Sequence, residues 1–147
     1  MANLGALGIV ALLGTPSNEH DELRDFSGLA RSRPGIAALM TVFLLSLGGF
    51  PPLAGFIAKW YVFSAAVQEG HYALAIIGVL TSVISVFFYL RIVVMMYMSE
   101  KQEAAAPPQV PRTALAALTL SAVVLFYLGV FPARVLDLAA RSVAGMF

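Results

Sequence analysis

A single lysine, Lys59, lies in a long apolar part of the chain and is the residue best placed to do chemistry. It is the only charged side chain between Arg33 and Glu69. A charge at the centre of a bilayer costs roughly 2.5–3.5 kcal/mol on insertion scales, so a lysine there is a candidate for function. Removal from water disfavours the charged form of an amine, which lets such a lysine bind and release a proton. Lys59 is therefore interpreted as a proton-relay group facing a hydrated channel; the alternative is a lysine that snorkels to the interface or is structurally paired.

Residues that weaken helices surround the start of the segment that carries this lysine. They are Gly48, Gly49, Pro51, Pro52 and Gly55. Proline removes a hydrogen-bond donor and pushes the residue before it out of the helical region. In a membrane, the backbone groups freed at such a break need water or protein partners, and transporters place ion sites at breaks of this kind. The alternative is an ordinary turn between two membrane spans.

The remaining residues do not combine into a second site. The chain has no cysteine, which excludes disulfides, thiolate-bound zinc and Cys-ligated iron–sulfur clusters. His20 and His71 lie far apart, and neither has a metal-ligand partner at useful spacing. Arg91 lies about two turns from the end of its expected span, from where it can snorkel to the headgroups. We therefore expect no metal and no cofactor on this chain.

Composition favours a membrane protein. Hydrophobic residues make up 60% and charged residues 12% of the 147, and the mean hydropathy is +0.87. Soluble domains average about 45–50% apolar and about 25% charged residues, and so few polar groups could not cover a soluble surface. The net charge of +1 gives no case for nucleic-acid binding. We expect an integral membrane protein that contacts the lipid bilayer.

The hydropathy pattern predicts an all-α, polytopic membrane helix bundle. Helices are expected at about 2–14, 35–48, 52–68, 72–98 and 113–131, and an amphipathic helix at about 133–145. The polar segments 15–34 and 99–112 should stay in water, and 15–34 should include a short amphipathic helix. The first apolar run has no basic flank or cleavage motif, so it is interpreted as part of a span or as a short buried helix rather than a signal peptide.

Residues 35–68 are too long for one straight span. Thirty-four helical residues extend about 51 Å, against a hydrocarbon core of about 30 Å. The glycines and prolines at 48–52 mark the natural break. Two half-length helices could then form a tight hairpin or one broken helix. The hairpin is favoured here, because each arm is close to spanning length.

Several stretches together resemble one family. "SLGGFPPLAGFIAKWYVFSAA" and "FFYLRIVVMMYM", with "MANLGALGIVALLG" and "DFSGLARSRP" upstream, resemble the C-terminal part of subunit N of the proton-translocating NADH–quinone oxidoreductase, respiratory complex I. The resemblance covers nearly the whole chain. It implies the C-terminal portion of an antiporter-like fold, built from two inverted repeats of five helices that each contain a broken helix. It also implies a subunit without redox cofactors.

The resemblance carries over to individual positions. Lys59 falls on the lysine of the second repeat's broken helix, which belongs to a central hydrophilic axis, and Pro51 and Pro52 match the turn before it. The expected partners are the other membrane subunits of complex I and the remaining helices of the same subunit, in the inner (cell) membrane of a bacterium. A full subunit has about fourteen spans and this chain has room for about five, so the chain is expected to be a fragment or a split gene product. Two alternatives stay open: a cation/proton antiporter component outside complex I, and a non-catalytic membrane scaffold.

Overall fold

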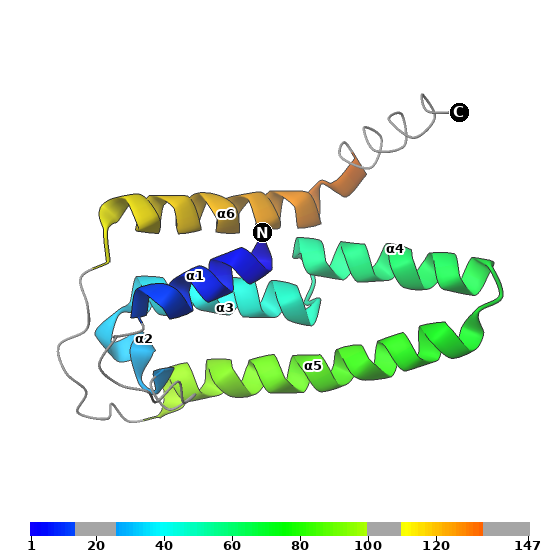
Figure 1. The fold of residues 1–147 in the computed structure, drawn as a ribbon, viewed down its shortest axis with the longest axis horizontal. Coiled ribbons are helices and arrows are strands. Elements are labelled where there is room, and N and C mark those ends of the chain that lie inside the picture. Colours follow the sequence, from blue (N-terminus) through cyan, green and yellow to red (C-terminus); the bar gives the residue numbers. More distant parts are fainter. Residues whose placement is uncertain (14–25, 100–109, 134–147) are drawn as a thin grey trace.

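The computed structural model describes residues 1–13, 26–99 and 110–133. These residues form six helices and no strand (Figure 1): α1 (Ala2–Leu13), α2 (Leu29–Ser32), α3 (Pro34–Gly48), α4 (Ala54–Gln68), α5 (Tyr72–Met98) and α6 (Arg112–Val130). The chain is a membrane-type helical bundle with one proline-interrupted helix, as the sequence predicts. The amphipathic helix expected at 133–145 and most of the two polar segments lie outside the described residues.

The expected hairpin between α3 and α4 is wrong. Figure 1 shows α4 continuing beyond the end of α3 in the same general direction, and α5 returning alongside both. Residues 35–68 are therefore one broken helix with a short interruption at residues 49–53. Glycine and proline indicate where a helix ends, but they do not fix the direction in which the chain leaves.

The break lies beside the middle of α5. A Cβ atom added at Gly48, the last residue of α3, would lie 3.5 Å from Val86 Cγ2 and 3.7 Å from Tyr89 Cδ2. Both residues lie near the midpoint of the 27-residue α5. Because α5 is the partner of both half-helices, the interruption falls inside the bundle rather than at the end of its longest helix.

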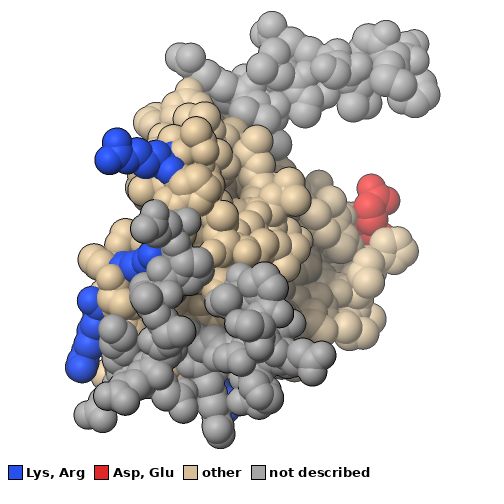
Figure 2. All heavy atoms as spheres, turned by 60° about the vertical axis from the view of Figure 1, so that its left-hand side comes forward, with Lys and Arg blue, Asp and Glu red and all other residues tan. Residues whose placement is uncertain are grey.

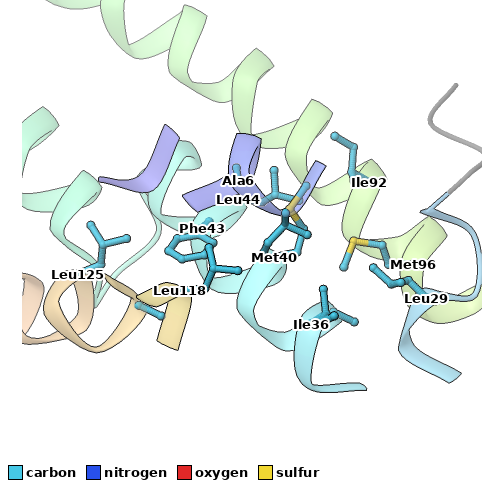
Figure 3. Close-up of a cluster of buried hydrophobic side chains, with 13 residues drawn as sticks. Ala6, Leu29, Ile36, Met40, Phe43, Leu44, Ile92, Met96, Leu118 and Leu125 are labelled. Atoms are coloured by element: carbon cyan, nitrogen blue, oxygen red, sulfur yellow. The ribbon is translucent and has the colours of Figure 1, made fainter. Parts of the chain in front are cut away.

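The hydrophobic core is concentrated around α3. Phe43 and Ile9 are fully buried between α1 and α3, and Met96 is fully buried at the far end of α5. α1 and α3 approach closely because Gly5 has no side chain: a Cβ there would overlap the Phe43 ring. Leu118 and Leu125 of α6 close the cluster on another side (Figure 3).

Two described helices, α5 and α6, are long and apolar enough to cross a membrane. Within the most apolar 18-residue window of α5, only 6% is buried inside the chain. An apolar helix that is exposed on most sides needs lipid or other helices around it. The length, apolarity and exposure of α5 together fit a membrane environment.

Most described charges lie at helix ends. Arg31 and Arg33 precede α3 and Arg112 begins α6, whereas Glu69, the only acidic residue in the described part, follows α4 at the other end of the bundle. In Figure 2 most of the visible basic groups lie on one side and the acidic group lies on the other. Lys59 and Arg91 are the two described charged residues that lie well inside long helices, so their surroundings decide their roles.

Candidate functional site at the helix break

The end of α3 is closed by its own backbone. The Phe50 N–H donates to the Leu45 carbonyl at 2.9 Å, and the Gly49 N–H donates to the Ser46 carbonyl at 3.1 Å. This is the Schellman pattern, which needs a left-handed residue after the helix. Gly49 takes that role with φ of 83°. Two of the four terminal carbonyls of α3 are satisfied in this way, and the carbonyl of Gly48 remains for another donor.

Lys59 supplies that donor. Its Nζ donates to the Gly48 carbonyl oxygen at 2.9 Å, and the side chain is partly buried. Side chains on a helix lean toward its N-terminus, so a lysine in the second turn of α4 extends back over the break. The C-terminal end of a helix carries partial negative charge, which attracts a cation. The contact therefore joins the charged group of α4 to the negative end of α3.

The first turn of α4 rests directly on the last turn of α3. A Cβ added at Gly55 would overlap the Ser46 carbonyl oxygen and lie 3.4 Å from Ser46 Oγ. Only a residue without a side chain allows the two backbones to come so close. α6 makes a similar approach, because a Cβ at Gly129 would overlap the Pro52 carbonyl oxygen. These two glycines hold the half-helices and α6 together around the interruption.

The structure brings five of the predicted residues into this contact region. Gly48 accepts from Lys59, Gly49 lies against the Lys59 side chain, and Gly55 touches Ser46. Pro51 and Pro52 are both exposed, and the backbone of Pro52 meets α6. These residues therefore lie together at the helix break, and their roles in proton transfer stay a prediction.

Two residues of the site, Ser46 and Gly129, were missed by the sequence analysis. Ser46 is 2% exposed, and its Oγ is the one buried side-chain polar atom without a hydrogen-bond partner in the described part of the chain. A serine among apolar residues does not indicate, from the sequence, that its hydroxyl will be buried without a partner. Gly129, by contrast, follows Leu128 near the end of a span, and an isolated glycine there could have suggested a close backbone approach.

Other features of the described residues offer no competing site. No group of three or more His, Asp or Glu side chains could hold a metal ion within them. A groove of about 620 Å³ lies between α4 and α5, and its lining includes Trp60, Phe63, Val79 and Leu80. This lining is mostly apolar and includes no charged residue.

The described helices form a bundle of membrane type with one proline-interrupted helix. Residues 1–85 match the family described as "NADH:quinone oxidoreductase/Mrp antiporter, TM". The chain belongs to this family.

Within the family, the chain is similar to proteins named NADH-quinone oxidoreductase subunit N. It is 43% identical over 143 residues to subunit N 2 of Rhizobium meliloti, a match that covers 97% of this chain and 30% of the relative. It is 42% identical over 141 residues to subunit N of Trichlorobacter lovleyi, covering 96% and 29%. The chain thus spans about three tenths of the length of these relatives.

A solved structure shows the same arrangement of helices. The chain matches part of the respiratory complex I from Thermus thermophilus with bound aureothin, with a TM-score of 0.78 and 31% sequence identity. The match covers 92% of this chain and 32% of the matched one. The fold described above is therefore that of a segment of a complex I membrane subunit.

Proposed function

We propose that this chain takes part in proton translocation by an NADH–quinone oxidoreductase, with Lys59 as a proton-carrying group. The observation that carries the proposal is the hydrogen bond from its partly buried amine to the Gly48 carbonyl, at the end of the first half of the broken helix. Redox chemistry takes place elsewhere in such an enzyme, and this chain would contribute no cofactor. The similarity to subunit N over nearly the whole chain supports this assignment.

The contact at the break suits a group that changes its protonation state. The Lys59 amine donates to the Gly48 carbonyl at the negative end of α3. A lysine amine is a group that can bind and release a proton. Arginine could not serve in the same way, because it does not lose its proton in proteins.

A second function for Lys59 follows from the same contact. A lysine that donates to the last carbonyl of α3 is also a cap that ties the two half-helices together. In that case the chain would be a scaffold with a structural lysine, and any long cationic donor could replace it. The two functions therefore make different predictions for arginine.

The deciding experiment places Lys59→Arg and Lys59→Ala in the full-length subunit of an assembled enzyme. We expect both variants to assemble and both to lower proton pumping and coupled quinone reduction by about tenfold or more, since a positioned proton-transfer group typically contributes 10²–10⁴-fold. The measurements are proton uptake into membrane vesicles and NADH oxidation in the same vesicles.

Arg91→Lys is the matched control, because it exchanges the same two residue types at an exposed position of α5. It should leave pumping and oxidation unchanged. Wild-type pumping in Lys59→Arg would overturn the relay function and favour the cap. Loss of assembly in Lys59→Ala together with normal assembly in Lys59→Arg would also favour the cap over the relay.

The proposed partners are the other membrane subunits of the enzyme and the remaining helices of a full-length subunit. The proposed location is the cell membrane of a bacterium, as the bacterial sources of the similar proteins suggest. A cation/proton antiporter outside complex I is the alternative that the family description also includes. Co-purification of the full-length subunit with an NADH-oxidising complex would separate the two.

A further inference from the structure

Ser46 stands out among the hydroxyl groups of the described helices. Those of Ser32, Thr41, Thr81, Ser85 and Thr119 each donate to a carbonyl three or four residues earlier in the same helix. Ser46 makes no such bond, although it is buried to 2% exposure in the last turn of α3. Burial of a hydroxyl without a partner is costly, so alanine would serve better if packing alone decided this position.

The position of this hydroxyl links it to Lys59. Ser46 Oγ lies 3.4 Å from the place where a Cβ of Gly55 would be. Gly55 lies four residues before Lys59, so both share one face of α4. The Lys59 side chain extends along the same face toward the break, where its amine meets Gly48, two residues after Ser46. The hydroxyl and the amine thus belong to the same small region between the half-helices.

The chemistry of the two partners differs. A backbone carbonyl only accepts hydrogen bonds, so the Gly48 oxygen can receive an N–H from lysine but cannot donate to its nitrogen. A serine hydroxyl both donates and accepts. It can accept from the protonated amine, and it can donate to the lone pair of the neutral amine.

We propose that Ser46 is a positioning residue for Lys59, and that its hydroxyl forms the alternative partner of the amine when the amine leaves the Gly48 carbonyl. This inference rests on the proposed function, since it concerns the two protonation states of the same lysine. The Gly48 carbonyl accepts a hydrogen bond from the protonated amine. The Ser46 hydroxyl can form a hydrogen bond with either the protonated or the neutral amine. The buried hydroxyl is kept at the break because the neutral amine needs a donor there.

The test compares Ser46→Ala, Ser46→Thr and Ser46→Val in the full-length subunit of the assembled enzyme. Threonine and valine have nearly the same shape and differ in the hydroxyl. We expect proton pumping to fall about two- to tenfold in the alanine and valine variants, as expected for the loss of one hydrogen bond, and the threonine variant to pump better than the valine variant. Thr41→Val, which removes a satisfied hydroxyl from the same helix, should pump like the wild type.

The same variants are then combined with Lys59→Ala. If Ser46 acts through Lys59, Ser46→Ala should cause no further loss in that background. Wild-type pumping in Ser46→Ala would overturn the role of Ser46 while leaving that of Lys59 intact, and so would an additive loss in the double variant. If threonine and valine both prevent assembly, the alanine variant and the double variant still decide. Wild-type pumping in Lys59→Ala would overturn both proposals together.

Discussion

The two halves of the broken helix have the same length but differ in how far their side chains are buried. α3 and α4 each contain 15 residues. Seven residues of α3 are buried in the bundle, and none of α4 is. Yet α4 is also apolar, with Lys59 as its only charged residue. One sequence segment thus supplies a core helix and an uncovered one, and the charged residue lies on the uncovered half.

The difference indicates what α4 needs. Trp60, Tyr61 and Val62 are 52–65% exposed within this chain. In a membrane such side chains are covered by lipid or by other helices. The family relatives are more than three times as long as this chain, and we propose that helices from the rest of the subunit complete the surroundings of α4. α3 therefore anchors the break, and the exposed side chains of α4 are the ones that helices outside this chain would cover.

The variants with the largest expected effect each remove one large side chain, one from each half of the broken helix. Phe43→Ala empties a fully buried site in the α3 core, and Trp60→Ala trims a side chain that is 62% exposed. Such cavities cost about 3–5 kcal/mol in soluble cores, and lost packing remains costly in lipid. We expect Phe43→Ala to reduce the amount of assembled subunit strongly and Trp60→Ala to reduce it less, measured on native gels of solubilised membranes. Equal losses would contradict the contrast between the halves.

The second test concerns the joint between the halves. Gly55→Ala would place a methyl group onto the Ser46 carbonyl oxygen, which belongs to a backbone that cannot move aside easily. We expect the free energy of unfolding of the subunit to fall by about 1–3 kcal/mol, as for other overpacked sites, and its melting temperature to fall with it. Gly35→Ala is the control, because nothing lies within 4 Å of its added Cβ atom. It should be neutral or slightly stabilising, since alanine is the better helix former. Similar melting temperatures for both variants would argue against the close approach.

The helical architecture could be predicted from the sequence because it depends on local features. Apolar runs of spanning length predict α5 and α6, and the glycines and prolines at 48–52 mark the place where α3 ends before α4 begins. Lys59 was identified because a lone charge in an apolar segment is conspicuous. These features are visible along the chain and need no knowledge of which helices touch.

The course of the chain after the break could not be predicted in the same way. The choice between hairpin and broken helix depends on contacts between distant residues, such as Gly129 with Pro52 and Gly48 with Val86. The partner of Lys59 was also hidden, because it is a backbone carbonyl and every residue has one. Ser46 differs from the other hydroxyl residues of the described helices only in three dimensions, because it is buried without a hydrogen-bond partner.

The smallest expected effect comes from Gly49, and it tests whether the contact between Lys59 and Gly48 matters. Gly49→Ala has a backbone cost of about 1–2 kcal/mol, because φ is 83°. Its methyl group would also lie 2.9 Å from Lys59 Cδ and 3.4 Å from Nζ, so the flexible lysine must move away from the Gly48 carbonyl. Gly70→Ala is a matched control, with φ of 77° and nothing within 4 Å of the added atom. Both variants should lose similar stability, since both place alanine in the left-handed region, whereas proton pumping per NADH oxidised should fall in Gly49→Ala alone. A ratio that stays at the wild-type value in both variants would mean that the position of the amine on the carbonyl end of α3 is unimportant for transfer. The lysine would then act through groups that meet α4 from outside this chain.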